Sequence, residues 1–544
     1  MDMDLTLSSS SPSDFLASVA PGFPEFFLLA LGSLVFLGGT FRQDRPLWGW
    51  ISFFGLVTAL ALALRPIFHS PMEGNAYHGP LVYDGLSQTL RLLTFLCGAG
   101  LVLMGWEEGD STHIAERNGL ILFATAGASL CVAANDLATL FLSLELVSIP
   151  TYLILFLTRG DKFGRESTLK YFLLSIFSSA MMLFGFSYLY GITGSLQIPE
   201  ILAILSQSSL NPVPEAVPTA RLVGLVMVVA GLGFKVTAVP FHFYAPDVYQ
   251  GTSHFGASVL STLPKIAGFA ALARLTGLTF ETNGGVFLPF ESQSSYLFWI
   301  LASVTMTLGN VIALWQTNLR RLFAYSGIAH AGYMLVALSV GKEVGATGAL
   351  AALVVYLWAY VAMTLGVFAI FIYLDKKGKH VEKVEHLNGL AKTDPVAGGI
   401  MVVLLMSLIG LPLTAGFIGK LALVQCALRR GLESAITEAH PNSELRLFFG
   451  LSIMILVNAA IAGWYYLRMI GALYLRKGKD THPSNRPVAA LVTGFVCVVV
   501  TVAVGILPGL VTRGIGEVPW HGIKSKAGMA NPMDKSPMEK PPGH

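Results

Sequence analysis

Charge is what this sequence has least of. Only 12% of its 544 residues are Asp, Glu, Lys or Arg, whereas 54% are hydrophobic. Soluble domains carry about twice that share of charged residues, and so few charges cannot cover a water-facing surface. Much of the chain must therefore face lipid. The formal net charge of +3 is also too small to indicate a nucleic-acid partner.

Cysteine is scarce as well, and its spacing excludes cluster chemistry. The four cysteines lie in apolar segments, and no two are at C-x-x-C spacing: Cys97, Cys131, Cys426 and Cys497. Disulfide frameworks and Cys-ligated metals need paired or clustered thiols. The sequence has no P-loop and no dinucleotide-binding glycine motif after a strand. We expect no cofactor and no metal on this chain, so any redox chemistry would belong to partner chains.

Long apolar runs fill the chain instead. A helix needs roughly 20 apolar residues to cross a bilayer, and this measure predicts an all-α polytopic membrane protein with about fourteen transmembrane helices. The predicted spans lie near 23–41, 47–65, 81–105, 118–135, 137–158, 167–193, 221–250, 255–277, 295–316, 321–341, 346–374, 396–427, 446–475 and 487–510. Only Asn135 and Asp136 separate the fourth span from the fifth.

Basic residues alternate between the predicted loops. Lys and Arg gather in loops on one side of the predicted spans, at 42–45, 159–170, 320–321, 376–392 and 476–486, whereas the loops on the other side are poor in them. The positive-inside rule places those loops inside and both termini outside. The start, MDMDLTLSSSSPSDF, lacks the features of a signal or transit peptide. A bacterial inner membrane with periplasmic termini is the simplest interpretation, although an organelle-encoded protein would look the same.

Proline interrupts two spans. One reads GLGFKVTAVPFHFYAPDVYQG (231–251) and the other SLIGLPLTAGFIGKLALV (407–424). In lipid, such a break persists only where it is buried in protein or lines a wet cavity. Each interrupted span is the fourth in a run of five, which favours two inverted five-helix repeats around a transport site. The predicted organisation is helices 1–3 in 1–117, a first repeat in 118–277, a second in 295–475, a last helix in 487–510 and a polar tail in 511–544.

Four charged residues within the spans are the candidate functional groups: Glu145, Lys235, Lys265 and Lys420. Each costs roughly 2.5–3.5 kcal/mol at the bilayer centre on insertion scales, so they should face one another or water. An ion pair between Glu145 and Lys235 would hold the lysine protonated, and separating the pair in a dry site would release the proton. Lys265 and Lys420 could then relay it. The alternative is a static ion pair with two lysines that extend to the interface.

Three histidines give a weaker signal. His330, in YSGIAHAGYM, lies inside a span and could relay protons near neutral pH. His242 follows Pro240, and His254 lies in a short predicted turn. A buried histidine is as readily a packing residue, so only His330 is retained as a possible relay.

These motifs resemble a known family. SLELVSIPTYLIL, GLGFKVTAVPFHFYAPDVYQG, LPKIAGFAALAR, QTNLRRLFAYSGIAHAGYML and SLIGLPLTAGFIGKLALV are similar to signature stretches of the antiporter-like membrane subunits of the proton-pumping NADH:quinone oxidoreductase, complex I. The first two stretches resemble its N-type members. The long lateral C-terminal helix of the L-type is absent, and TSHFGAS after PDVYQG and QTNLRR depart from the usual pattern.

The resemblance implies fourteen helices with inverted repeats and a role in proton translocation while quinone is reduced elsewhere. It implies that Glu145 and Lys235 are the coupled pair, Lys265 the central relay and Lys420 the proton-transfer lysine of the second half. NADH, FMN, Fe–S clusters and quinone would bind partner subunits, and M-type and K-type membrane subunits would be neighbours.

Two other readings share this chemistry or this fold. The chain could belong to a multisubunit Mrp-type Na+/H+ antiporter or a membrane-bound hydrogenase, or it could only scaffold an assembly. The resemblance of the motifs to N-type members favours the redox-driven pump. The sequence leaves open the electron donor, the number of protons, the choice between proton and sodium, and the direction of transfer.

Overall fold

A bundle of α-helices makes up the computed structural model, which describes residues 22–42, 45–68, 79–106, 113–207, 216–278, 291–341, 348–375, 381–437, 441–477, 487–512 and 515. Within these residues the chain forms isolated β-bridges but no strand. Twelve helices are long and apolar enough to cross a membrane. The chain is therefore a multi-pass membrane protein, as the composition predicts. The 376–380 and 478–486 loop residues and nearly all of the predicted tail lie outside the described residues.

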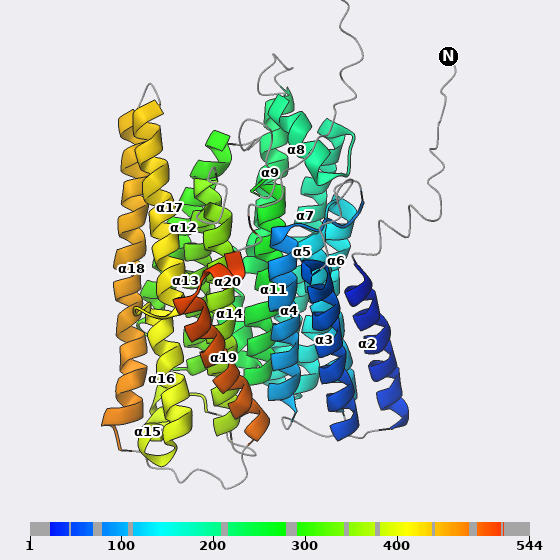
Figure 1. Ribbon diagram of the computed structural model, residues 1–544, viewed down its shortest axis with the longest axis vertical. Coiled ribbons are helices and arrows are strands. Elements are labelled where there is room, and N and C mark those ends of the chain that lie inside the picture. The colour runs from blue at the N-terminus through cyan, green and yellow to red at the C-terminus, as the bar shows by residue number, and fades with distance from the viewer. Residues whose placement is uncertain are drawn as a thin grey trace, which may run out of the picture.

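The helices lie side by side along the long axis of the bundle, with the N-terminal helices on one side and the yellow and orange helices on the other (Figure 1). The first are α2 (Phe23–Phe41), α3 (Arg45–Phe68), α4 (Gly85–Gly105), α5 (Ile114–Ala133), α6 (Leu137–Thr158), α7 (Lys162–Thr193), α8 (Ile198–Gln207), α9 (Ala216–Val236), α10 (Ala245–Gly251) and α11 (His254–Leu275). They are followed by α12 (Glu291–Ala313), α13 (Leu319–Val340), α14 (Ala349–Leu374), η3 (Val384–Leu387), α15 (Leu390–Thr393), α16 (Pro395–Ile409), α17 (Ala415–Thr437), α18 (Pro441–Leu475), α19 (Val488–Ile506) and α20 (Gly509–Thr512).

The count of spans differs from the predicted fourteen in a specific way. The twelve candidates leave out α5 and the split pair α16 and α17, which occupy the fourth and twelfth predicted spans. The short helix α8 was not predicted at all. Its buried residues are Ile198, Ile201, Leu202 and Leu205, and their spacing is that of one helical face. This face packs against α7 and α11.

The separation of α5 from α6 occurs where only Asn135 and Asp136 predicted it. Helix α5 ends at Ala133, and the Asp136 carboxylate accepts a 2.8 Å hydrogen bond from the backbone N–H of Thr139. A carboxylate at this position satisfies a donor that the first turn of a helix leaves without an intrahelical partner. The backbone N–H of Asn135 donates to the carbonyl of Pro80. The prediction of a break here is confirmed.

Both predicted interruptions are also present. Helix α9 ends at Val236 and α10 begins at Ala245, while α16 ends at Ile409 and α17 begins at Ala415. Each break contains a non-glycine residue with positive φ, Thr237 in the first and Leu413 in the second.

Protein groups supply hydrogen-bond partners around the first break, where lipid would offer none. The backbone N–H of Val239 donates to Thr305 Oγ1 on α12 at 3.0 Å. The Tyr244 hydroxyl donates to the carbonyl of Phe234 at 3.0 Å. The break is thus held open by contacts from its own loop and from α12.

Helices α11, α13 and α14 form the centre of the bundle. Their hydrophobic spans are completely buried inside the chain, and Figure 1 shows them between α2–α4 on one side and α17–α18 on the other. Helix α11 packs against α4, α5, α6, α9, α13 and α14. A helix surrounded in this way can carry polar groups that never meet lipid.

Two buried Arg–carboxylate pairs, which the sequence analysis did not identify, tie the first helices together. Arg274 at the end of α11 donates to both carboxylate oxygens of Asp84, at 2.5 and 2.8 Å, and to the carbonyl of Val132 at 2.9 Å. Arg91 on α4 forms a similar two-bond contact with Glu25 on α2, at 2.7 and 2.6 Å. Two-bond geometry of this kind makes strong, directional contacts.

The Asp84–Arg274 pair generates a stability prediction. Arg274→Leu should destabilise the chain by about 3–5 kcal/mol, because it leaves a buried carboxylate uncompensated. The double variant Asp84→Asn/Arg274→Leu should recover most of that loss. Thermal unfolding in mild detergent measures both. Arg321→Leu, which removes a partly exposed pair with Asp247, is the control and should change stability little. Equal losses for Arg274→Leu and Arg321→Leu would contradict the structural role.

Candidate functional site

The first functional cluster lies where α6, α7 and α9 meet. Lys235 Nζ is 3.8 Å from Glu145 Oε1, and the side chain of Lys235 is 2% exposed whereas that of Glu145 is 24% exposed. The structure therefore brings together the two residues that the sequence predicts as a pair. At 3.8 Å the two charges attract, but the distance is too long for a direct hydrogen bond.

Serine hydroxyls contact both members of this pair. Lys235 Nζ donates to Ser148 Oγ at 2.6 Å and to Ser175 Oγ at 3.1 Å. Ser179 donates to Glu145. A hydroxyl both donates and accepts, so it can solvate the lysine in its charged and its neutral form. Ser175 and Ser179 stand out in the sequence as polar residues of a helix face, but nothing in the sequence singles out Ser148 on α6.

Small residues bring α7 and α9 close enough for these contacts. The Ser178 hydroxyl donates to the carbonyl of Gly231 at 2.7 Å. A Cβ at Gly231 would lie 2.6 Å from Met182 Cβ and 2.8 Å from the carbonyl oxygen of Ser178, so only glycine fits this crossing. Lys235 lies one turn further along α9, immediately before the break.

Lys265 is buried on α11, close to the first cluster. A Cβ added at Gly268, one turn away on the same helix, would lie 3.4 Å from Lys235 Cβ. Lys265 Nζ donates to the carbonyl of Gly327 on α13 at 2.5 Å and lies 4.8 Å from the centre of the Tyr360 ring. In the part of the chain that the structure describes, no carboxylate is within ion-pair distance of Lys265. A carbonyl dipole and a ring face therefore solvate its amine.

His330 lies at the junction of α13, α14 and α18. Its Nδ1 is 2.9 Å from the hydroxyl of Tyr356, and its Nε2 is 3.3 Å from that of Tyr466. Its ring centre is 5.5 Å from that of Tyr360, the ring that faces Lys265. The predicted relay residue thus lies within a set of tyrosines rather than in an apolar environment.

Lys420 is the sixth residue of α17 and faces the end of α16. Its Nζ donates to the carbonyls of Leu408 and Ile409 at 2.9 and 2.8 Å. These carbonyls belong to the last turn of a helix, which has no intrahelical donors for them and carries partial negative charge. The Tyr333 ring centre is 5.3 Å from Nζ. The carbonyls at the second break therefore bind the lysine.

Polar residues that the sequence analysis missed extend the row beyond Lys420. The Tyr333 hydroxyl accepts a 3.0 Å hydrogen bond from Asn310 on α12, and Asn310 also bonds Asn458 and Tyr465 on α18, at 3.2 and 3.1 Å. The sequence did contain a signal for this network. An asparagine inside an apolar helix needs a hydrogen-bond partner from the protein, because lipid offers none. Asn310 bonds Tyr333 and Asn458 bonds Asn310, so this network depends on the packing of α12, α13 and α18.

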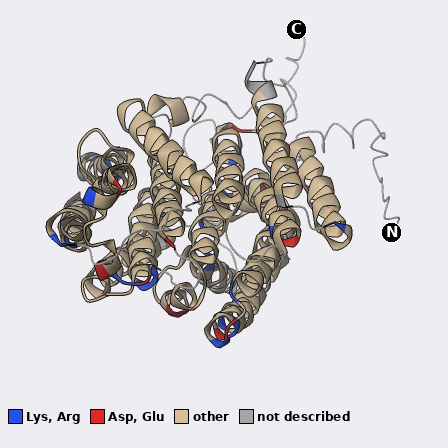
Figure 2. Cartoon of the chain, turned by 90° about the horizontal axis from the view of Figure 1, so that it is seen from below, with Lys and Arg blue, Asp and Glu red and all other residues tan. Residues whose placement is uncertain are grey.

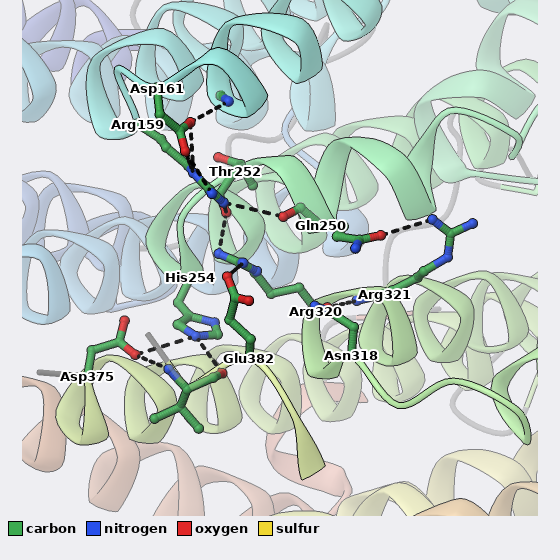
Figure 3. A network of polar contacts seen from close by, with 12 residues as sticks. Arg159, Asp161, Gln250, Thr252, His254, Asn318, Arg320, Arg321, Asp375 and Glu382 are labelled. Carbon is green, nitrogen blue, oxygen red and sulfur yellow. Dashed lines mark hydrogen bonds and ion pairs between the residues drawn. The ribbon is translucent and has the colours of Figure 1, made fainter. Parts of the chain in front are cut away.

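His254 belongs to a different network, at the end of the molecule that carries the 159–170 and 320–321 loops (Figure 3). Its Nε2 is 3.0 Å from the carbonyl of Val381 and 3.6 Å from Asp375 Oδ1. Nearby, Asp161 caps α7. Desolvation raises the pKa of Asp161, but hydrogen bonds from Arg159 and the Gly164 N–H outweigh it and leave the pKa lowered.

The residues that the structure describes include no group of three or more His, Cys, Asp or Glu that could hold a metal ion. The four cysteines are buried, and none of them forms a disulfide. The candidate site is thus a row of one carboxylate, three amines, one imidazole and neighbouring hydroxyls. It runs from Glu145 through Lys235, Lys265 and His330 to Lys420. Such groups can accept and donate protons but offer no redox centre of their own.

Comparisons with known proteins show the family of this chain. The sequence profile of the family described as NADH:quinone oxidoreductase/Mrp antiporter, transmembrane region, matches residues 134–439. NADH-quinone oxidoreductase subunit N of Desulfovibrio desulfuricans is 34% identical over 93% of this chain and 97% of its own length. A chain of respiratory complex I from Thermus thermophilus superposes with a TM-score of 0.71 at 30% identity, over 90% of this chain and 98% of its own.

A chain of the Mrp complex from Dietzia has the same fold. It superposes with a TM-score of 0.74 at 20% identity, over 92% of this chain and 96% of its own. The matched family region spans both broken helices and all four buried charged residues of the candidate site. The chain therefore belongs to the NADH:quinone oxidoreductase/Mrp antiporter transmembrane family and, within it, to the subunit N group.

Proposed function

We propose that this chain is a proton-translocating membrane-arm subunit of an NADH:quinone oxidoreductase, which couples quinone reduction on partner subunits to proton transfer through Glu145, Lys235, Lys265 and Lys420. The observation that carries the proposal is the buried row itself. Its lysines are held in the hydrophobic bundle mainly by neutral oxygens and ring faces, which leaves an amine able to exist in either protonation state.

The Glu145–Lys235 cluster is the part of the row that can respond to a conformational change. While the carboxylate is 3.8 Å from the amine, it stabilises the ammonium form. When the two separate, the desolvated ammonium favours loss of its proton. The Ser148 and Ser175 hydroxyls then solvate the neutral amine, and α11 offers Lys265 as the next carrier.

From Lys265 the proton would pass to the second half. The tyrosine rings of α14 and α13 face Lys265 and Lys420 respectively, and His330 lies between them with two tyrosine hydroxyls in contact. A hydroxyl that accepts one proton while it donates another can serve as a bridge. His330 is the relay in this scheme.

Neighbouring membrane subunits would complete the assembly. The Glu145 side chain is partly exposed, and on its helix face Leu142 and Ile149 are 66% and 45% exposed in the single chain. An M-type or K-type neighbour would cover this face. NADH, FMN, Fe–S clusters and quinone would bind other subunits.

A bacterial inner membrane with both termini periplasmic is the proposed placement. Figure 2 looks onto the end where the basic loops gather. The described Lys and Arg residues of these loops and of the helix ends beside them are Arg42, Arg159, Lys162, Arg165, Lys170, Arg320, Arg321, Lys383, Lys392, Arg476 and Lys477. The positive-inside rule assigns this end to the cytoplasm.

The assembly is tested by purifying the tagged chain in gentle detergent and identifying its partners. We expect iron–sulfur and quinone-binding subunits, together with NADH:quinone reductase activity. Recovery with only other antiporter-like chains, and no redox subunit, would instead support an Mrp-type antiporter and would call for sodium–proton exchange assays.

Lys235→Met should abolish most proton pumping and lower coupled turnover while the complex still assembles, because methionine keeps the bulk of the side chain without a titratable group. Pumping by the complex reconstituted in liposomes is the measurement. Lys162→Met, at an exposed lysine of α7, is the matched control and should pump normally. Normal pumping in assembled Lys235→Met would refute the assigned role.

Glu145→Gln should lower pumping less than Lys235→Met does. The carboxamide can still accept a hydrogen bond from Ser179, which now donates to Glu145, but it no longer holds the ammonium charge. The same liposome assay ranks the two variants. A loss equal to or larger than that of Lys235→Met would show that the negative charge itself dominates.

Gly327→Ala should displace Lys265 without preventing folding. The added methyl would lie 2.9 Å from Lys265 Nζ and 3.0 Å from the Tyr360 hydroxyl, so the flexible amine must leave its carbonyl. We expect reduced pumping with assembly preserved. Gly191→Ala, a helical glycine with nothing within 4 Å, is the control. If both alanine variants pump like wild type, the position of Lys265 at this carbonyl is not required.

A further inference from the structure

A second polar network joins the two halves of the chain at the end shown in Figure 3. Arg320 at the start of α13 donates to the carbonyl of Thr252 and to Glu382, both at 2.6 Å. Arg159 is bonded to Asp161 at 3.0 Å. Each arginine thus has its own carboxylate. The row from Glu145 to Lys420 uses none of these residues.

His254, the first residue of α11, is the titratable group buried in this network. It is 0% exposed, and its Nε2 lies 3.0 Å from the carbonyl of Val381 and 3.6 Å from Asp375 Oδ1. Asp375 accepts a 2.8 Å hydrogen bond from the Val381 N–H, and its side chain is 14% exposed. A carboxylate at the surface therefore leads directly to a buried imidazole.

A polar stripe leads from His254 into the bundle along α11. His254, Ser258, Ser261 and Lys265 are spaced i, i+4, i+7 and i+11, which places them on one face of the helix. All four are at most 1% exposed. At 1.5 Å per residue, His254 and Lys265 are about 16 Å apart along the axis, or about half the hydrocarbon thickness of a bilayer. Both hydroxyls donate to α11 carbonyls, at 2.6 and 2.8 Å, and their oxygens still offer acceptor sites.

Phenylalanines separate His254 from the tyrosines around His330. The His254 ring centre is 5.3 Å from that of Phe371 and 6.4 Å from that of Phe368. Phe323 lies 5.6 and 5.8 Å from the same two rings and 6.4 Å from Tyr466. An apolar layer thus lies between the surface network and the central row, and a proton cannot pass it without a carrier or water.

We propose that His254 is a proton-uptake residue of this chain, which receives protons from water at this end through Asp375 and supplies them along the Ser258–Ser261 stripe to Lys265. The inference rests on the proposed function and assigns the route by which its central lysine is recharged. Imidazole is the side chain suited to this task near neutral pH. Asp375 passes a proton to Nε2 of a neutral imidazole whose own proton is on Nδ1, which gives an imidazolium beside the carboxylate, and Asp375 is protonated again from water. Loss of the Nδ1 proton towards a neutral Lys265 returns the ring to its neutral form and the lysine to ammonium.

Charged groups of this network lie on four segments around His254 (Figure 3). They are Asp375 after α14, Glu382 from the segment before η3, Arg320 from α13 and Arg159 from the α6–α7 connection. Arg320 binds Glu382 and Arg159 binds Asp161, while Asp375 lies 3.6 Å from the imidazole, where its charge stabilises an imidazolium. The layer of Phe323, Phe368 and Phe371 keeps the proton from bypassing α11.

The test compares His254→Gln with wild type in the purified whole complex, in detergent and in liposomes, between about pH 5 and 8, where imidazole titrates. Glutamine can still donate to the Val381 carbonyl but cannot carry a proton. We expect wild-type turnover and pumping to fall as pH rises through the titration of His254. His254→Gln should be severalfold slower at the acidic end and should lack that fall. Asp375→Asn should slow uptake in the same way.

Controls separate this proposal from a structural role and from the proposed function. Glu166→Gln, at an exposed carboxylate of α7 paired with Lys170, makes the same chemical change as Asp375→Asn and should leave the pH profile unchanged. A lower yield of His254→Gln complex with a wild-type pH profile per complex would overturn the uptake role. If Lys235→Met stops pumping while His254→Gln pumps normally, only the uptake proposal fails; if Lys235→Met pumps normally, the proposed function fails.

Discussion

The structure depends on one constraint: inside a membrane, every backbone polar group and every charge needs a partner within the protein. Two helices of this chain break within the bundle and expose carbonyls and N–H groups that an intact helix would satisfy itself. Thr305 satisfies the first break through the N–H of Val239, and Lys420 satisfies the second through the carbonyls of Leu408 and Ile409. The carbonyls that the second break leaves without helical N–H partners thus form a binding site for an amine.

The buried cations divide into two kinds by their partners. Arg91 and Arg274 each bind a carboxylate through two hydrogen bonds, and a guanidinium does not lose its proton in proteins. These pairs are fixed and structural. The buried lysines face serines, carbonyls and tyrosine rings, and among the residues that the structure describes only Lys235 has a carboxylate partner, at 3.8 Å. An amine has an accessible neutral form, so neutral partners leave its protonation free to change. In Arg91, Arg274 and the three buried lysines, the choice of Arg or Lys thus follows whether the charge is fixed by a carboxylate or can be lost with a proton.

The sequence was sufficient for features that one segment determines alone. Pro240 and Pro412 predict the breaks, Asn135 and Asp136 predict the end of α5, and four charges in apolar runs predict the residues of the row. It was not sufficient where function depends on which segments meet. Ser148 is one of many helical serines until Lys235 bonds it. Nothing in the sequence singles out Arg274, because its contact with Asp84, which is 190 positions away in the sequence, is a product of tertiary packing. His254 reads as a turn residue because Asp375 and Val381 lie far along the chain.

Helix α12 connects the two halves in a way that no motif indicates. Its Thr305 holds the backbone of the first break, and its Asn310, five residues later, bonds Tyr333, the tyrosine whose ring faces Lys420. A helix transmits displacement along its axis because its hydrogen-bonded turns are stiff compared with a loop. A rearrangement of the break next to Lys235 would therefore move the amide that orients Tyr333 unless the Val239–Thr305 bond gives way first. Coupling of this kind requires an element with two arrangements that both sites bias, and the loop from Thr237 to Tyr244, held by α12 and by its own tyrosine, is the element placed to supply them.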